Sequence, residues 1–156
     1  MAGFFQAAEI AAAAVHIEQQ GQAFYRHAAE VSKNPGIRDF FLFFAEEEAR
    51  HEQFFQQLKD RLGKIELPAW STSEEYGAYL QALIDSHSIF SPQLQKGLAE
   101  ATSENEAIRL AMGFEKDTIL FFMEMKELVP QSEQKIVQQC IEEEREHFRR
   151  LSKMLT

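Results

Sequence analysis

Hydrophobic residues recur every three to four positions along four long stretches of the chain, at about 4–31, 35–62, 103–129 and 131–154. This spacing places apolar side chains on one face of an α-helix and is typical of amphipathic helices. The breaks between stretches carry turn-forming residues, as at Asn34-Pro35-Gly36, Gly63 and Pro130. Because no run of alternating β-branched residues indicates a strand, the pattern predicts an all-α protein.

The segment from about 63 to 102 has a different pattern and predicts a crossover between two helical hairpins. Leu67-Pro68-Ala69-Trp70 is expected to be extended. The run 71–75 has capping-box spacing and predicts a short helix that ends near Ser88. Ser91-Pro92 predicts a second short helix that ends near Ala101. The whole chain, 1–156, is therefore expected to form one four-helix bundle with a long crossover that contains short helices.

The two halves of the sequence repeat. The second long stretch contains Glu46-Glu47-Glu48-Ala49-Arg50-His51, and the fourth contains Glu142-Glu143-Glu144-Arg145-Glu146-His147. Each is matched by one Glu of the stretch before it: Glu18 lies 30 positions before Glu48, and Glu115 lies 29 positions before Glu144. A repeat with matched spacing of acids and histidines indicates two structurally equivalent halves.

The helical phase places these acids on the buried faces. At about 100° per residue, Glu18, Glu48, Glu115 and Glu144 each lie at the centre of an apolar stripe. His51 and His147 lie about 60° to one side of the Glu three positions before them. Other charged residues fall near the opposite face and are predicted to be solvated: Glu9, His16, His27, Asp39, Glu46, Glu106 and Glu124. The phase also assigns Glu47, Glu142 and Glu143 to solvated faces, and His87 lies in the crossover, where no face can be assigned.

Four carboxylates inside an apolar core are costly unless protons, basic side chains or metal ions compensate them. The middle turns carry no Lys or Arg at the core angles. Glu-x-x-His places a carboxylate and an imidazole on one helix face, where both can bind the same ion. Two such motifs and two single Glu residues suit two ions bridged by carboxylates, and this set of ligands favours iron or manganese. Glu52 lies about 40° from Glu48 and is left out of the set because its repeat partner is Phe148.

Composition and charge narrow the class of protein. The 156 residues include 16 Lys and Arg, 25 Asp and Glu and a single Cys, for a net charge of −9. One Cys excludes a disulfide framework, a CxxC zinc site and a cysteine-bound iron–sulfur cluster. The acidic balance argues against nucleic acid or an anionic membrane surface as a partner. No signal peptide or membrane span is expected, so the predicted location is the cytoplasm.

These motifs resemble those of ferritin-like di-iron carboxylate proteins, and within them the rubrerythrin-like branch. The resemblance covers the four long helices and implies two iron ions, with manganese as an alternative. It implies that Glu48 and Glu144 bridge the ions, that Glu18 and Glu115 are terminal ligands, and that His51 and His147 each bind one ion. Tyr25 matches a tyrosine near the metals of rubrerythrins.

The chain departs from the rubrerythrin pattern in two ways. A second Glu is expected three positions after Glu115, but Thr118 stands there, and its counterpart after Glu18 is Gly21. The two CxxC motifs of a rubredoxin domain are missing, so electrons would come from a separate protein. The resemblance implies an oxidoreductase that reduces peroxide or dioxygen, and a homodimer is expected. A ferroxidase that handles iron, or a bundle with purely structural metals, are the alternatives.

Overall fold

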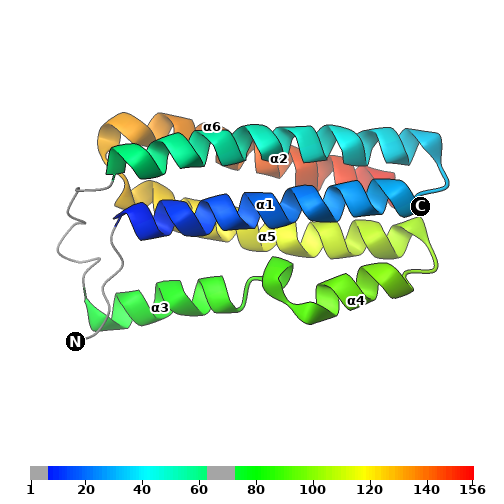
Figure 1. Cartoon of the computed structure of the whole chain (residues 1–156), viewed down its shortest axis with the longest axis horizontal. Coiled ribbons are helices and arrows are strands. Elements are labelled where there is room, and N and C mark those ends of the chain that lie inside the picture. The colour runs from blue at the N-terminus through cyan, green and yellow to red at the C-terminus, as the bar shows by residue number, and fades with distance from the viewer. Residues whose placement is uncertain (1–6, 63–72) are drawn as a thin grey trace.

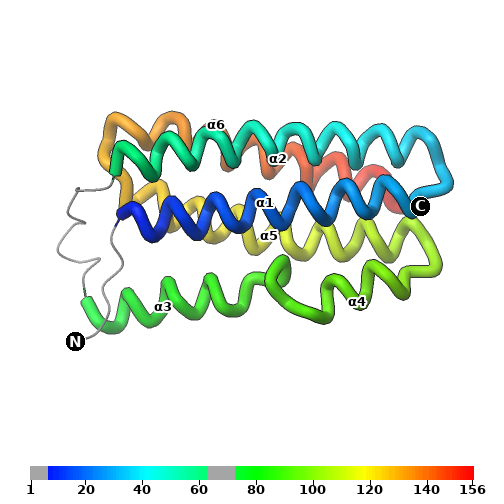
Figure 2. Tube along the Cα trace, viewed as in Figure 1, coloured from blue at the N-terminus to red at the C-terminus, as the bar shows by residue number. Residues whose placement is uncertain are grey.

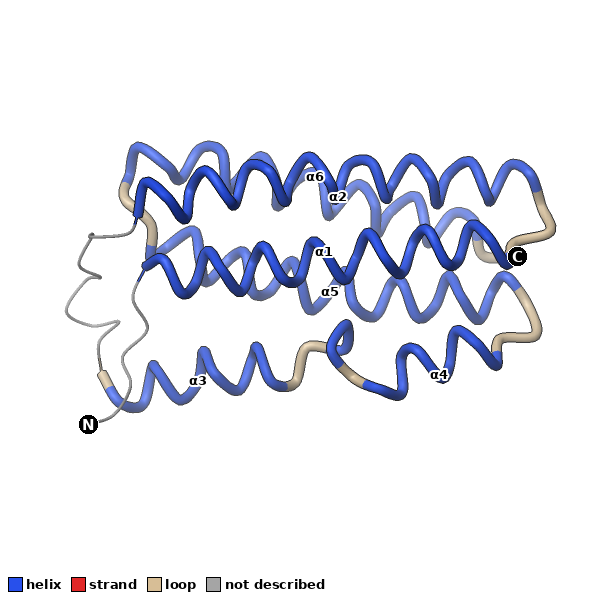
Figure 3. Tube along the Cα trace, in the orientation of Figure 1, coloured by secondary structure: helices blue, strands red, loops and turns tan. Residues whose placement is uncertain are grey.

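Four long helices form the body of the protein in the computed structural model, which describes residues 7–62 and 73–156. The long helices are α1 (Ala7–Val31), α2 (Pro35–Leu62), α5 (Glu104–Leu128) and α6 (Gln131–Met154). Helices α1 and α2 form one antiparallel hairpin, and α5 and α6 form the other (Figures 1 and 2). The described residues contain no strand (Figure 3). The predicted all-α bundle of two hairpins is confirmed.

The helix boundaries follow the turn signals in the sequence. Asn34 precedes α2 and caps it, because its side-chain oxygen accepts hydrogen bonds from the backbone N–H of Gly36 at 2.9 Å and of Ile37 at 3.3 Å. Ser103 caps α5 by accepting from the N–H of Glu106. The Glu106 side chain accepts from the N–H of Thr102 at 2.7 Å, one residue before the N–H that a capping box would use.

The crossover consists of α3 (Glu74–Asp85), a 3₁₀ turn η2 (Ser88–Phe90) and α4 (Pro92–Glu100). Ser91 caps α4 at its predicted start, and Ser73 caps α3. The capping-box spacing in 71–75 instead pointed to Ser71 or Thr72, because Tyr76 and not Glu follows Ser73 by three positions. The 3₁₀ turn was not predicted. The predicted extended run 67–70, and the predicted helical residues 4–6 and 71–72, lie outside the described residues. The crossover runs along the layer formed by α1 and α5, with η2 in contact with both helices (Figure 1).

The apolar stripes of the four long helices form the core. Among the large side chains that are fully buried are Phe24, Phe41, Phe44, Phe55, Phe121 and Phe122. Of the residues predicted to be outward, all are exposed except Glu47, Glu124 and Glu143, which are half-buried. Glu124 is half-buried because α3 covers it, and it accepts a hydrogen bond from the Tyr76 hydroxyl at 2.7 Å. Within the described residues, no helix combines the length and the apolar run that a bilayer span requires.

Candidate metal centre

The six residues of the repeated motifs meet in the middle of the bundle. Each comes from the inward face of its helix, one Glu from α1, one from α5, and a Glu and a His from each of α2 and α6. None is more than 3% exposed: Glu18, Glu48, His51, Glu115, Glu144 and His147. The structure thus brings together all six residues that the sequence singled out.

These residues form two overlapping groups of four. Within each group, one potential ligand atom from every residue lies within 4.8 Å of the others. The first group contains Glu18 and His51 and the second contains Glu115 and His147, whereas Glu48 and Glu144 belong to both. This arrangement has two positions for ions and two carboxylates between them, which is the geometry of a bridged two-metal site in a helical bundle.

The two histidines present their Nδ1 atoms to the carboxylates. His51 Nδ1 lies 2.8 Å from Glu144 Oε1 and 3.7 Å from Glu18 Oε1. His147 Nδ1 lies 3.1 Å from Glu144 Oε2 and 3.5 Å from Glu115 Oε1. Both imidazoles therefore face the same shared carboxylate, each on its own side.

Buried polar atoms that form no hydrogen bond indicate whether these residues suit metal ions. In the described part of the chain, nine buried side-chain nitrogen or oxygen atoms form no hydrogen bond, and eight belong to these six residues. They include both oxygens of Glu18, both oxygens of Glu144 and Nδ1 of each histidine. Buried polar atoms without a partner are costly, and together these are a set of oxygen and nitrogen donors that suits iron or manganese.

Without metal ions, the buried carboxylates of the centre have pKa values that are shifted in different directions. Burial raises the pKa of Glu18 well above its usual range, and the charge of Glu48 raises it further. Burial also raises the pKa of Glu115, as do the charges of Glu144 and Glu48. Burial opposes ionisation of Glu144 too, but the two facing imidazoles hold its pKa well below the usual range. Glu144 therefore stays charged, and so does Glu48, whose pKa is lowered, despite its burial, by its contacts with Glu18 and the two imidazoles.

The two histidines have raised pKa values because negatively charged carboxylates face them. Burial alone would lower the pKa of His51, but the charges of Glu18 and Glu144 raise it well above its usual value. Burial is likewise outweighed at His147, where the charge of Glu144 raises the pKa. Without metal, the centre therefore holds protons on both imidazoles.

Two further glutamates complete the centre, and the sequence interpretation of them as solvated was wrong. Nε2 of His51 lies 2.6 Å from Glu143 Oε2, and Nε2 of His147 is hydrogen-bonded to Glu47 Oε2. Each contact crosses between α2 and α6, so each motif orients the histidine of the other. Arg50 donates to Glu143 at 2.5 Å, and the hydrogen bond with His51, followed by that with Arg50, lowers the pKa of Glu143 to about 2. The repeat carried the signal, because both residues directly precede the Glu of Glu-x-x-His.

Replacing Glu143 with alanine is expected to weaken one metal position more than the other. The carboxylate fixes the ring of His51 with Nδ1 toward the centre, and losing such an orienting group costs about 10- to 100-fold in metal affinity. Glu47→Ala should do the same to the position that His147 serves. Isothermal titration with Mn²⁺ would resolve the two positions, and the exposed Glu142→Ala is the matched control. Equal affinities for Glu143→Ala and Glu142→Ala would contradict the expectation.

Tyr25 lies against one of the single glutamates. Its hydroxyl donates a hydrogen bond to Glu115 Oε1, and its ring is fully buried between Phe24, Phe41 and Phe44. Burial raises the pKa of Tyr25 well above its usual value, and the negative charge of Glu115 raises it further. The phenol therefore keeps its proton beside the centre.

The structure also shows the surroundings of Glu52, Cys140 and Gly21. Glu52 accepts hydrogen bonds from Gln19 at 2.9 Å and Gln22 at 2.5 Å and belongs to neither group of four. Cys140 is buried, and burial raises the pKa of its thiol to about 12. At Gly21, an added Cβ would lie 3.6 Å from Cγ and Cδ of Glu48. The glycine thus lies directly against the centre.

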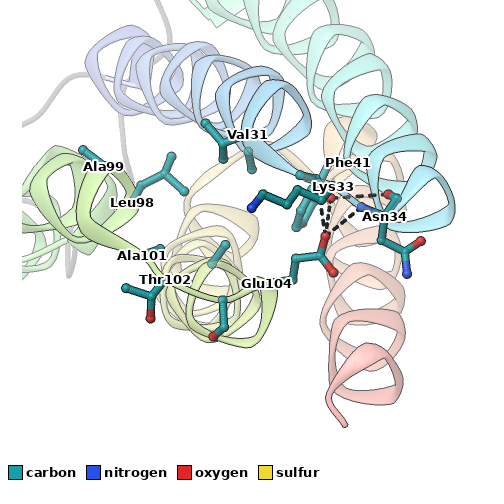
Figure 4. Close-up of a pocket in the computed structure, with 13 residues that line it drawn as sticks. Val31, Lys33, Asn34, Phe41, Leu98, Ala99, Ala101, Thr102 and Glu104 are labelled. Carbon is teal, nitrogen blue, oxygen red and sulfur yellow. Dashed lines mark hydrogen bonds between the residues drawn. The ribbon is translucent and has the colours of Figure 1, made fainter.

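A cavity of about 670 Å³ lies at the end of the bundle, between the α1–α2 turn and the start of α5 (Figure 4). Glu104 fixes the turn there by accepting hydrogen bonds from the backbone N–H of Lys33 at 3.1 Å and of Asn34 at 2.9 Å. None of the six central residues lines this cavity. Phe41 lines it and stacks on Tyr25 with ring centroids 6.0 Å apart, so aromatic rings separate the cavity from the centre.

Fold and site together define a four-helix bundle with a paired carboxylate and histidine centre. The sequence profile of the Rubrerythrin family matches residues 9–155, so the chain belongs to this family. Among solved structures, it is similar to a Thermotoga maritima protein described as ferritin-like and diiron-carboxylate. The two share 26% sequence identity at a TM-score of 0.71, over 97% of this chain and 95% of the other. No curated protein matches the sequence.

Proposed function

We propose that this protein is a di-iron oxidoreductase that reduces hydrogen peroxide or dioxygen. The observation that carries the proposal is the pair of overlapping ligand groups that share Glu48 and Glu144. Glu18 and His51 would hold one iron ion and Glu115 and His147 the other, and Glu48 and Glu144, which belong to both groups, would serve both ions. Iron is proposed over manganese because the similar Thermotoga maritima protein is described as a diiron-carboxylate protein.

Two ferrous ions held by these ligands would supply two electrons, which with two protons convert one hydrogen peroxide into two waters and leave two ferric ions. The chain's own residues make the surroundings dry and fix the ligands. Phe44 covers His147, with ring centroids 4.6 Å apart. Tyr25 packs on Phe44, and Phe24 and Phe41 pack on Tyr25. A closed apolar shell keeps water from competing for the centre and strengthens electrostatic interactions inside it.

Tyr25 would hold a proton at Glu115, since its hydroxyl donates to Oε1 of that carboxylate. We propose that electrons come from a separate reductant protein, because the one Cys in the sequence is buried and has a raised pKa. The homodimer remains a prediction.

Protein loaded anaerobically with two Fe²⁺ per chain should be oxidised by hydrogen peroxide at least tenfold faster than free Fe²⁺. The reason is that the centre holds two ions side by side, so both electrons are delivered from one place. Stopped-flow absorbance would measure the rate, and titration should show one peroxide consumed per two Fe²⁺. Fe²⁺ mixed with Glu144→Ala protein is the control. Oxidation no faster than that of free Fe²⁺ would rule the proposal out.

A further inference from the structure

A buried polar pair lies where the crossover covers α5. His87, at the start of η2, is 2% exposed, and Thr118 of α5 is 3% exposed. Nε2 of His87 and the hydroxyl oxygen of Thr118 lie 2.9 Å apart. Neither residue belongs to the two ligand groups.

The direction of this hydrogen bond is fixed by the other nitrogen of the ring. Nδ1 of His87 accepts a hydrogen bond from the backbone N–H of Ile89 at 3.1 Å, so Nδ1 carries a lone pair and no proton. Burial lowers the pKa of His87 to about 4, so the ring is neutral at neutral pH. A neutral imidazole has one N–H, which must then be on Nε2. His87 is therefore the donor and Thr118 the acceptor.

This leaves the hydrogen of the Thr118 hydroxyl without an acceptor. A hydroxyl has one donor and two acceptor positions, and His87 occupies one of the acceptor positions. A helical threonine often donates to the carbonyl four residues back, here that of Phe114. Within the described residues, however, Thr118 forms no hydrogen bond other than that with His87. A buried donor without an acceptor is costly, which points to an acceptor that is not part of the protein.

The position of Thr118 in the repeat indicates where that acceptor lies. Thr118 follows Glu115 by three positions, as Gly21 follows Glu18. Gly21 lies against the Glu48 carboxylate. From the repeat of the two halves we infer that Thr118 occupies the matching place beside Glu144. The histidines face the centre from α2 and α6, and their outer nitrogens are held by Glu47 and Glu143. Neither ligand group takes a histidine from α1 or α5, and Gly21 and Thr118 are the residues of these helices that follow the ligand Glu by three positions.

We propose that the Thr118 hydroxyl donates a hydrogen bond to a small anionic ligand, of the peroxide, hydroxide or azide class, that binds the centre from the side of α1 and α5. His87 is a positioning residue, because its N–H occupies the Thr118 oxygen and turns the hydroxyl hydrogen toward that ligand. This inference rests on the metal centre of the proposed function but not on its reaction.

Azide tests the inference without turnover. Titration of the oxidised protein, loaded with two irons per chain, should give an absorbance change from which the azide affinity is obtained. Thr118→Val keeps the shape and removes the hydroxyl, so azide should bind about tenfold more weakly, as expected for one lost hydrogen bond to an anion. Thr118→Ser keeps the hydroxyl and should bind azide within about twofold of the unchanged protein.

A double-mutant cycle separates positioning from a merely structural role. His87→Leu should weaken azide binding, and His87→Gln, which can still donate to Thr118, should restore it. Adding His87→Leu to Thr118→Val should have no further effect, because His87 acts only through the hydroxyl. The double variant also removes both partners of the buried hydrogen bond, so it is expected to fold even if Thr118→Val alone is unstable. In the metal-free protein, ¹⁵N NMR should show His87 neutral and protonated on Nε2.

The outcomes separate this inference from the proposed function. Azide affinity that is unchanged in a Thr118→Val protein with two irons per chain would overturn the inference, as would a His87 ring protonated on Nδ1. If azide binding depends on Thr118 but peroxide does not oxidise the ferrous protein, the inference stands and the proposed reaction fails.

Discussion

Replacing Glu144 with alanine is expected to abolish binding at both metal positions. Glu144 belongs to both ligand groups and is fully buried between the two imidazoles, with an oxygen 2.8 Å from His51 Nδ1 and the other 3.1 Å from His147 Nδ1. Removing an orienting residue alone costs up to about a hundredfold in metal affinity, so loss of a shared ligand should cost at least that much for each ion. Metal analysis after anaerobic loading should fall from two ions per chain to fewer than one.

The comparison with His147→Ala makes this expectation specific to a shared ligand. His147 belongs to one group only, so its replacement leaves the four residues of the other group intact and should leave one ion per chain. Glu142→Ala is the matched control, because Glu142 lies on the same helix and is exposed. Among the residues that the structure describes, its side chain accepts a hydrogen bond only from Gln138, at 3.2 Å. If Glu144→Ala kept two ions per chain, the bridged arrangement would be refuted. Equal losses in Glu144→Ala and His147→Ala would refute the division into two groups.

The sequence alone located the centre because helical periodicity and the repeat constrain the same positions. Four carboxylates at the middle of apolar stripes must be compensated, and the fixed spacing of Glu-x-x-His places both side chains on one face. Each long helix has a single buried face, so the phase of Glu48 or Glu144 within its stripe fixes its direction. The six residues therefore meet in the structure as the two halves of the repeat predict.

Contacts between helices could not be predicted from the sequence in the same way. Glu47 and Glu143 each lie about 100° around the helix from the inward Glu, on a side that is solvated unless another helix lies there. Whether α2 and α6 approach closely enough for these residues to reach the opposite histidine depends on packing, which periodicity does not give. His87 poses the same difficulty, because it lies in a short irregular segment with no repeating phase and its burial is set by η2 against α5.

Metal binding to this centre is expected to release about two protons per ion. Without metal, the raised pKa values of Glu18 and Glu115 favour the protonated carboxyls, and the raised pKa values of His51 and His147 favour the charged imidazoles. Glu144 is ionised. Burial and the charge of Glu144 oppose ionisation of Glu48, but contacts with Glu18 and the imidazoles lower its pKa, so it is ionised too.

The charge balance explains the number of protons. Two imidazolium charges offset two carboxylate charges in the metal-free centre, and two divalent ions offset four carboxylates in the loaded one. Exchanging four protons for two ions therefore keeps a buried site neutral in both states, which a low-dielectric interior favours. Because the protonated forms cannot bind metal, acid competes with the ions, and the affinity must fall as the pH falls.

Below the raised pKa values, the affinity for each ion is expected to fall about a hundredfold for every unit that the pH falls. Titration calorimetry of Mn²⁺ in buffers with different ionisation enthalpies would count the protons directly. Glu18→Gln is the informative variant, because it removes one carboxyl that must lose its proton and should reduce the count for both ions together from about four to about three. Binding heats that do not depend on the buffer would mean that the centre is already deprotonated, and would contradict the neutral exchange of protons for metal.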